Sequence, residues 1–354
     1  MRAVILAGGE GTRLRPLTLT TPKPVVPVVD RPFLRHQLDL LARAGVRDVV
    51  FSIAYRPERV ESVFGDGSSI GMSIRYAVED TPLGTGGAVR NALPLLDERT
   101  IVLNGDVLTD VELAPLVRRH EAEGASATIL LTSVPNPSAY GLVETDAAGR
   151  VQRFLEKPKP HEITTDTINA GIYILETRTL ELIPAAVKHS IERAFFPTLL
   201  GRGDRVLGPV HRGYWIDIGT PEKYLQVHRD ILRGRFQVAL DATGRAGGFV
   251  AAGARVDAGA ELEAPFYIGP GCEVEAGAHV GPDAVLVGDT RVRAGARVSD
   301  SVLWRGCDLG ELAAVATSLI GPSVRIGSHA SLRGVVLGEG SVVSDHSRAA
   351  EALA

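Results

Sequence analysis

The chain has 354 residues, of which 45% are apolar, and a formal net charge of -4 at pH 7. This length exceeds that of a usual single domain, so we expect two domains. A slightly acidic chain offers no broad basic field, which argues against a nucleic acid partner, and no apolar stretch is long enough to cross a membrane. The two cysteines are too few for a disulfide framework, and the first residues do not resemble a signal peptide. We therefore expect a cytoplasmic protein.

The first predicted element is a short buried strand that ends in glycines. Residues 3–6 are apolar, and three glycines follow among residues 8–11. In an open α/β sheet, ligands bind at the carboxyl ends of strands. Glycines allow several main-chain N–H groups to face one anion, and Arg13, Arg15 and Lys23 add positive charge. The stretch therefore predicts a binding loop for a polyphosphate.

The spacing in this loop excludes two familiar phosphate-binding motifs. No Lys follows Gly11, as a Walker loop requires, and Leu14 stands where the dinucleotide fingerprint needs its third glycine. Residues 9–24, GEGTRLRPLTLTTPKP, instead resemble the motif G-x-G-T-R-L-x-P-x-T-x-x-x-P-K-P of the sugar-1-phosphate nucleotidyltransferases, also called nucleotide-sugar pyrophosphorylases. The resemblance implies that the following residues bind the nucleotide: Leu6, Ala7, Gly8, Gly9, Gly11, Thr12 and Arg13.

Strands and helices alternate after the loop. Expected helices are 32–44, with Gly45 as its C-terminal cap, 57–64, 88–96 and 112–123; expected strands are 46–53, 73–78, 100–104 and 127–132. This alternation predicts a Rossmann-like, mostly parallel sheet with helices on both faces. Further along, strands 141–145 and 151–156 are expected to form a hairpin, followed by a strand at 168–175 and helices at 180–186, 194–200 and 221–233.

A different period begins near residue 256. Apolar residues recur at every sixth position, and after a disturbance around residues 303–309 the pattern resumes. The first run is Val256, Leu262, Ile268, Val274, Val280, Leu286, Val292 and Val298. A period of six fits neither a helix nor a hairpin, but it fits a solenoid in which each side contributes one inward residue. The pattern resembles the hexapeptide repeat of left-handed parallel β-helices.

The expected fold class is thus α/β, with a Rossmann-like, mostly parallel sheet domain followed by a left-handed parallel β-helix. We expect a nucleotidyltransferase catalytic domain at residues 1–235, a linker at 236–250, a hexapeptide-repeat β-helix at 251–345 and a tail at 346–354. Three histidines lie in or just after the repeats, where related acyltransferases use a histidine base. We favour polar surface positions for them, because no acyl-donor motif accompanies them.

The reaction implied by the resemblance joins two polyanions and expels pyrophosphate. Its nucleophile is a phosphate oxygen, so the protein must supply alignment and charge neutralisation. Asp106 follows an apolar strand in an N-G-D sequence, and Asp217 lies in W-I-D-I-G-T. Both match the metal-binding aspartates of the family, and Mg²⁺ suits one or two carboxylates completed by phosphate oxygens and water. The resemblance implies catalytic roles for Arg13, Lys23 and Lys157 and makes Asp106 a nucleotide contact as well.

Two further motifs concern the nucleobase and the sugar. Residues 79–87, EDTPLGTGG, resemble the family's E-x-x-x-L-G-T-x-G nucleobase loop, which implies contacts from Glu79, Gly84 and Thr85. Glu79 could accept from the donor pair on a guanine edge, although relatives that use other bases also carry a Glu here. The resemblance further implies that the sugar phosphate is bound by Gly141, Glu156, Lys157 and Asn169, which lie in Y-G, E-K-P and N-A-G segments.

The sequence as a whole most resembles mannose-1-phosphate guanylyltransferases and their heptose- or cyclitol-phosphate relatives. The expected reaction is Mg²⁺-dependent transfer of a nucleotidyl group from an NTP, with GTP favoured, to a sugar 1-phosphate, with mannose 1-phosphate favoured. Residues 86–88 and 104–106 depart from the guanylyltransferase pattern, which leaves base and sugar open: the alternatives are uridylyl, thymidylyl or adenylyl transfer, or a heptose or cyclitol acceptor. A non-catalytic paralogue that binds nucleotide sugars is the other alternative. We expect a homo-oligomer, either a dimer or a tetramer.

Overall fold

The computed structural model describes residues 1–351, and these form two compact units. The sheet unit contains Met1–Gly9 and Leu34–Trp215, and the repeat unit contains Glu10–Phe33 and the chain from Ile216 onward. The chain therefore first passes from one unit to the other inside the glycine-rich loop.

The sheet unit is built on one mixed sheet of ten strands. Its main path is β10 (Val151–Glu156), β9 (Gly141–Thr145), β11 (Thr167–Glu176), β6 (Arg99–Asn104), β1 (Arg2–Leu6), β4 (Asp48–Ile53) and β5 (Ser73–Val78). β8 (Ala127–Ser133) pairs with β11 and with the short strands β12 (Val206–Leu207) and β13 (Val210–His211). The path from β6 through β1 and β4 to β5 is parallel, and β9 and β10 form an antiparallel hairpin. The predicted Rossmann-like sheet and the hairpin are therefore confirmed.

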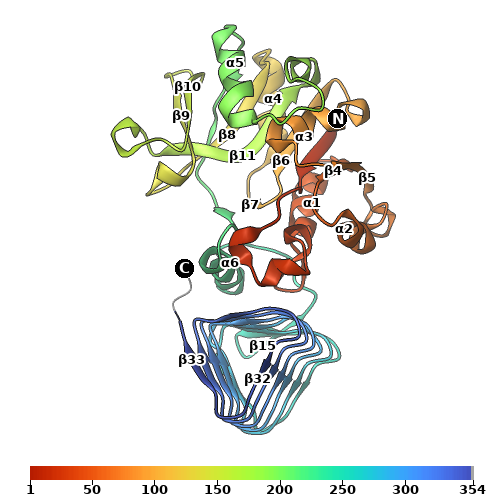
Figure 1. Ribbon diagram of the computed structural model, residues 1–354, viewed down its shortest axis with the longest axis vertical. Coiled ribbons are helices and arrows are strands. Elements are labelled where there is room, and N and C mark those ends of the chain that lie inside the picture. Colours follow the sequence, from red (N-terminus) through yellow and green to blue (C-terminus); the bar gives the residue numbers. More distant parts are fainter. Residues whose placement is uncertain (352–354) are drawn as a thin grey trace. The chain divides into compact units, whose positions relative to one another are not determined.

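Helices connect these strands. They are α1 (Phe33–Arg43), α2 (Pro57–Phe64), α3 (Gly84–Ala92), α4 (Leu113–Ala122), α5 (Phe196–Gly201) and α6 (Pro221–Leu232), the last of which belongs to the repeat unit. Gly45 follows α1 with φ 76°, as its predicted cap role requires. Pro57 and Pro221 each open a helix, where a missing N–H costs no hydrogen bond. α3 packs on β1 and β4, and α4 packs on β8 and β11 (Figure 1).

Three predicted helices of the sheet unit differ from the structure. The helix expected at 88–96 begins earlier, as α3 at Gly84, and its last part is a 3₁₀ turn, η5 (Leu93–Leu95), because Pro94 cannot continue an α-helix. Thr177–Leu182 forms a 3₁₀ helix, η8, that ends before the predicted helix 180–186 would. Pro184 explains this, because it disfavours helical angles at Ile183. The third predicted helix, 194–200, is α5, and a π-helical segment at Ile191–Phe195 (η9) precedes it. Such segments are rare and often accompany functional sites.

The repeat domain, from β15 to β33, is a parallel β-helix whose coils are triangular in Figure 1. One sheet contains β15 (Thr243–Arg245), β16 (Gly248–Val250), β19 (Phe266–Ile268), β22 (Ala284–Leu286), β25 (Val302–Leu303), β28 (Leu319–Ile320) and β31 (Val336–Leu337). The second contains β17 (Arg255–Val256), β20 (Glu273–Val274), β23 (Arg291–Val292), β26 (Asp308–Leu309), β29 (Arg325–Ile326) and β32 (Val342–Val343). The third contains β18 (Glu261–Leu262), β21 (His279–Val280), β24 (Arg297–Ser299), β27 (Ala314–Ala316), β30 (Ser331–Arg333) and β33 (Arg348–Ala350). The predicted β-helix is therefore confirmed.

The remaining elements are short. They include β2 (Pro27–Val28), β3 (Arg31–Pro32), β7 (Val107–Thr109), β14 (Trp215–Asp217) and three 3₁₀ turns in the glycine-rich loop, η1 (Thr12–Leu14), η2 (Leu17–Leu19) and η3 (Lys23–Val25). Further 3₁₀ turns are η4 (Ser68–Ile70), η6 (Pro137–Ala139) and η7 (Pro160–Glu162). Among residues 1–351, every helix is too short or too polar to span a membrane.

The coils of the repeat domain change length along the chain. Val256 pairs with Val274, and Val274 with Val292, so the early coils have 18 residues. Val292 pairs with Leu309, and Leu309 with Ile326, so the later coils have 17. The inward residues at the predicted six-residue spacing pack into one hydrophobic core, in which the first two, Val256 and Leu262, are only partly buried.

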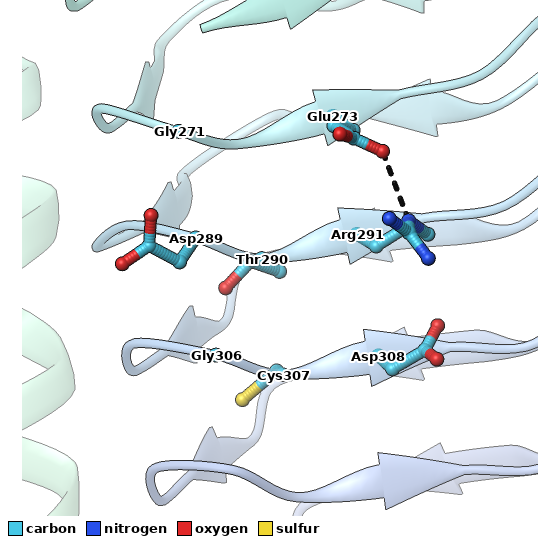
Figure 2. A pocket seen from close by; sticks show the side chains of 8 residues that line it. All are labelled: Gly271, Glu273, Asp289, Thr290, Arg291, Gly306, Cys307 and Asp308. Atoms are coloured by element: carbon cyan, nitrogen blue, oxygen red, sulfur yellow. Dashed lines mark hydrogen bonds and ion pairs between the residues drawn. The ribbon is translucent and has the colours of Figure 1, made fainter. Parts of the chain in front are cut away.

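The outer face of the second sheet carries alternating charges. A pocket of about 240 Å³ lies on this face, and Arg291 donates to Glu273 there at 2.9 Å. Figure 2 shows the residues that line it. Asp308, in the next coil, receives two hydrogen bonds from Arg293, at 2.9 and 2.8 Å. Cys307 also lines the pocket, but burial raises the pKa of its thiol to about 12, so it stays protonated at neutral pH. The charges here are thus already paired within the repeat domain.

Candidate active site

The carboxyl ends of β1 and β6 bring the first part of the glycine-rich loop beside Asp106. These strands are parallel neighbours, and Leu6 pairs with Asn104. The Gly105 N–H donates to the Leu6 carbonyl at 2.9 Å, and a Cβ at Gly105 would lie only 2.4 Å from that oxygen. Glycine is therefore required before Asp106, and the carboxylate is placed at the edge of the sheet where β1 ends.

Glu79 lies at the same edge, directly after β5, and is buried. Its carboxylate accepts from the Ser52 hydroxyl at 2.9 Å and from the Leu83 N–H at 2.8 Å. A Cβ at Gly8 would lie 3.5 Å from this carboxylate. Glu79 thus links β4 to the predicted nucleobase loop, residues 79–87, which we call the base-reading loop. A nucleobase would have to donate to the remaining lone pairs of the Glu79 carboxylate oxygens.

The base-reading loop is held by a distant segment, residues 187–192. The His189 carbonyl accepts from Gly86 and Gly87 N–H groups at 2.9 and 3.2 Å. The Thr85 hydroxyl donates to Glu192 at 2.7 Å and accepts from the Ile191 N–H at 3.0 Å. His189 and Glu192 were not predicted from the sequence, because Glu192 is 107 residues away from Thr85 along the chain.

The hairpin β9–β10 places the sugar-binding candidates Gly141 and Glu156 opposite each other. A Cβ at Gly141 would lie 2.8 Å from a Glu156 carboxylate oxygen and equally close to the Phe154 ring. Glycine at this position therefore leaves room for the carboxylate beside the backbone. The exposed Lys157 follows with φ 51°, a left-handed conformation that a lysine rarely adopts, and its N–H donates to the Tyr140 carbonyl at 3.0 Å.

Asn169 lies on β11, in the same unit. Its side-chain amide donates to the Tyr173 hydroxyl at 2.8 Å and accepts from the Gly171 N–H at 2.9 Å. Gly171 has φ 74°, and a Cβ there would approach the Asn104 amide to 2.8 Å. Asn169 is thus fixed in orientation, and its backbone segment lies against the end of β6.

The electrostatics of this region centre on Glu156. Burial, and then the negative charge of Glu192, raise the pKa of Glu156, whereas Lys157 and Arg193 lower it. Because Glu192 also bonds to Thr85, one carboxylate links the base-reading loop to the sugar-binding candidate Glu156.

The second part of the glycine-rich loop belongs to the repeat unit. Gly11 has φ 63° and precedes η1, which contains Thr12 and Arg13. The Thr18 hydroxyl donates to the Gly11 carbonyl at 2.7 Å and closes the loop on itself. The predicted contacts Gly11, Thr12 and Arg13 are therefore presented by one tight turn.

Arg13 lies close to Asp217. A Cβ at Gly219 would be 2.5 Å from an Arg13 guanidinium nitrogen and 3.1 Å from an Asp217 carboxylate oxygen. Asp217 also forms an ion pair with Lys223, in the first turn of α6. Lys223 was not predicted, since on the sequence alone it is an ordinary charged residue of an amphipathic helix.

The predicted catalytic cation Lys23 lies in η3 and is buried, with 8% of its surface exposed. A Cβ added at Gly11 would lie 3.4 Å from the Lys23 Cβ, so Lys23 packs against the turn that carries Arg13. Lys23 is thus held in the same loop as Arg13.

The donor set fits a magnesium ion. No group of three or more His, Cys, Asp and Glu residues that could hold a metal occurs among residues 1–351. Each of the two predicted metal-binding residues, Asp106 and Asp217, offers only carboxylate oxygens. Mg²⁺ characteristically takes one or two carboxylates and fills its shell with substrate phosphates and water, whereas Zn²⁺ would require nitrogen or sulfur ligands.

The candidates are distributed over both units. The sheet unit contains Leu6, Ala7, Gly8, Gly9, Glu79, Gly84, Thr85, Asp106, Gly141, Glu156, Lys157 and Asn169, and the repeat unit contains Gly11, Thr12, Arg13, Lys23 and Asp217. Within the sheet unit, the contacts described above join the end of β1, the base-reading loop and the sugar-binding candidates.

Models of known protein families match both parts of the chain. Residues 2–234 match the family model described as nucleotidyl transferase, and residues 262–353 match the model described as GMPPB C-terminal domain.

Individual relatives carry consistent names. A mannose-1-phosphate guanylyltransferase of Mycobacterium tuberculosis is 45% identical over 66% of this chain and 65% of its own length. The Probable mannose-1-phosphate guanylyltransferase 2 of Arabidopsis thaliana is 36% identical over 98% of this chain and 93% of its own. A crystal structure of HddC from Yersinia pseudotuberculosis, complexed with GMP-PN, matches with a TM-score of 0.55 and 30% identity over 64% of this chain and 97% of that one.

Proposed function

Because the chain belongs to the nucleotidyl transferase family and is a nucleotidyltransferase, we propose that it transfers a guanylyl group from GTP to mannose 1-phosphate. The products are GDP-mannose and pyrophosphate. The observation that carries this proposal is the similarity, over nearly the whole length of both chains, to a plant relative named for the same reaction. The HddC structure with GMP-PN supports a guanine nucleotide as donor.

The proposed chemistry needs no protein nucleophile. A phosphate oxygen of mannose 1-phosphate attacks the α-phosphorus of GTP in line, the new P–O bond forms, and the bond to the β-phosphate breaks as pyrophosphate leaves with the electron pair. Arg13 and Lys23 neutralise the triphosphate and the charge that develops on pyrophosphate. Lys157 binds and orients the acceptor phosphate. These cations act by alignment and charge compensation.

Asp106 and Asp217 are the proposed Mg²⁺ ligands. The bound ion would supply Lewis-acid neutralisation of the phosphate oxygens. Asp106 is held at the end of β6 by the requirement for glycine at position 105. Asp217 pairs with Lys223, so a proposed role of Lys223 is to neutralise this carboxylate while no substrate is bound.

The acceptor sugar is proposed to lie at the hairpin. Glu156 and Asn169 can accept hydrogen bonds from sugar hydroxyls, and Gly141 allows the sugar ring to approach the backbone. On the donor side, Glu79, Gly84 and Thr85 are proposed to contact the base. The carboxylate of Glu79 can accept from the N–H and amino groups of guanine, which uracil, thymine and adenine do not offer as a pair.

We further propose a cytoplasmic location and a homo-oligomeric state, a dimer or a tetramer. Both cysteines are buried thiols, Cys272 with its pKa raised to about 11, which fits a reducing compartment. Light scattering of the purified full-length chain tests the oligomer, and a monomeric mass at micromolar concentration would contradict it.

The function is tested by pyrophosphate release. The protein, with Mg²⁺, is incubated with each of GTP, UTP, dTTP, ATP and CTP against mannose, glucose, heptose and cyclitol phosphates. We expect the highest kcat/KM with GTP and mannose 1-phosphate. A higher value for another pair would replace the proposed substrates but keep the reaction. No turnover with any pair, from protein that binds GDP-mannose, would favour a non-catalytic role.

A further inference from the structure

The cation-bearing part of the glycine-rich loop belongs to the same compact unit as the β-helix. Glu10–Phe33, which contains Arg13, Arg15 and Lys23, forms one unit with α6 and the repeat domain, whereas Met1–Gly9 belongs to the sheet unit. Nothing in the sequence motif indicates this division. Contacts within the repeat unit therefore hold this part of the loop.

The end of the loop is held by α6. The Tyr224 hydroxyl donates to the Pro27 carbonyl, and the Val29 N–H donates to His228 Nδ1 at 3.3 Å. Both side chains are fully buried. Buried hydrogen bonds of this kind fix the backbone of the loop, because breaking them leaves an unsatisfied polar group.

α6 is in turn attached to the β-helix. Arg229 makes a two-pronged hydrogen bond to Asp300, at 2.6 and 2.7 Å, and Arg233 pairs in the same way with Asp283. These aspartates occupy corners of successive coils, with φ of 46° and 55°. The Tyr224 ring also packs edge-on against Trp304, 6.4 Å between ring centres. Bidentate arginine pairs fix orientation as well as position, so the helix is locked onto the coil stack.

The middle of the loop rests directly on the β-helix. Gly338 follows β31, and a Cβ built there would lie 3.1 Å from Pro16 Cβ and 3.5 Å from Pro16 Cγ. The nearest atoms to that added Cβ all belong to Pro16. Pro16 stands between η1, which carries Arg13, and η2. Close packing at this point therefore constrains the backbone on which Arg13 and Arg15 are mounted.

We propose that the β-helix is a positioning platform for the triphosphate-binding cations, and that Gly338 is a positioning residue that acts through Pro16. The proposal rests on the proposed function, since it assigns Arg13 to the triphosphate. A displaced loop would misplace the cations with respect to GTP but would leave the acceptor motifs of the sheet unit as they are.

The test is Gly338→Val in the full-length chain, with Gly244→Val as the matched control. Gly244 also lies in the repeat domain, on β15, and a Cβ there meets no atom within 4 Å. We expect KM for GTP to rise about tenfold in Gly338→Val, since displacements near 1 Å can cost up to a hundredfold. KM for mannose 1-phosphate and the melting temperature should match those of Gly244→Val.

Two further variants keep the test decisive. Gly338→Ala needs only a small shift of Pro16 and should raise KM for GTP less than Gly338→Val does. In a Pro16→Gly background, which removes the two nearest contacted atoms, Cβ and Cγ, Gly338→Val should have little additional effect. The proposed positioning role of the β-helix would be contradicted by equal KM values for GTP in Gly338→Val and Gly244→Val. It would also be contradicted if the effects of Pro16→Gly and Gly338→Val were additive.

Failure of the proposed function is distinguishable from failure of the platform. A wild-type chain without turnover would count against the proposed function. The GTP affinities of the same variants, measured by calorimetry, would then replace KM. We expect weaker GTP binding by Gly338→Val. Unchanged GTP binding would contradict the positioning role of the β-helix.

Discussion

Glu156 illustrates how a single residue would set the conditions for the proposed binding of the acceptor sugar. Burial and the charge of Glu192 raise its pKa, so at mildly acidic pH more of it is protonated than of an ordinary glutamate. A protonated Glu156 loses acceptor capacity for sugar hydroxyls. The groups that face it are Glu192, Lys157, Arg193 and the buried Tyr173.

A first prediction follows for the pH dependence. Glu192→Gln removes the negative charge that raises the pKa of Glu156, so Glu156 ionises at lower pH. We expect the acidic limb of kcat/KM for mannose 1-phosphate to move to lower pH. Glu181→Gln, an exposed glutamate in η8, is the matched control and should leave the profile unchanged. An acidic limb that stays in place in Glu192→Gln would contradict the coupling.

A second prediction concerns the metal. Asp106→Asn keeps the shape of the side chain but removes the charge that we propose binds Mg²⁺. We expect kcat to fall about 10²- to 10³-fold, a loss typical of removing one preorganised electrostatic contact. A rise in the Mg²⁺ concentration needed for half-maximal activity should accompany it. Asp48→Asn, at an exposed position that opens β4, provides the comparison. Turnover like that of Asp48→Asn would mean that Asp106 has no metal role.

At the scale of elements, the base-reading loop depends on the segment at 187–192. The His189 carbonyl accepts from two N–H groups in the first turn of α3, and these donors are thereby satisfied within the protein. A Cβ at Gly87 would lie 2.8 Å from both the Val187 carbonyl and the Leu83 side chain. Glycine at this position, where the sequence departs from the guanylyltransferase pattern, therefore permits the close approach of the two segments.

A third prediction tests this contact. Gly87→Ala should push residues 187–189 away from α3, which costs about 1–3 kcal/mol for an overpacked site. We expect a lower melting temperature and a higher KM for GTP. Gly201→Ala, at the end of α5 where a Cβ meets no atom within 4 Å, should change neither quantity. A Gly87→Ala variant indistinguishable from Gly201→Ala would show that the contact does not support the loop.

Local patterns predicted most elements, because local physics forms them. Gly45 ends α1 through its positive φ, and the hairpin of β9 and β10 follows from the turn between them. The six-residue period predicted the β-helix, and its disturbance after Val298 has a simple cause. One side of each later coil is five residues long, as between Val298 and Leu303, and the inward direction is kept.

Other features could not be predicted, because they depend on contacts between distant residues. No local signal brings Glu192 to Thr85 or Pro16 to Gly338. The sequence alone gives Lys223 the character of a surface charge, whereas in the structure it forms an ion pair with Asp217. The site candidates follow from the resemblance to the family motif and remain predictions, whereas the residues that support them are evident only from the packing.

At the scale of the whole molecule, the proposed site residues are divided between the two units. The sheet unit carries the base-reading loop, the acceptor motifs and Asp106, and the repeat unit carries Arg13, Lys23 and Asp217. Neither unit alone contains the complete set of residues proposed for the reaction.

The most direct test of the central claim follows the oxygen atoms. Mannose 1-phosphate labelled with ¹⁸O at its non-bridging phosphate oxygens is incubated with GTP, Mg²⁺ and the protein. The masses of the products are then determined by mass spectrometry. The account predicts GDP-mannose that retains all of the label and pyrophosphate that carries none, because the acceptor oxygen attacks the α-phosphorus directly. Loss of label from the sugar nucleotide, or no GDP-mannose from folded protein, would contradict it.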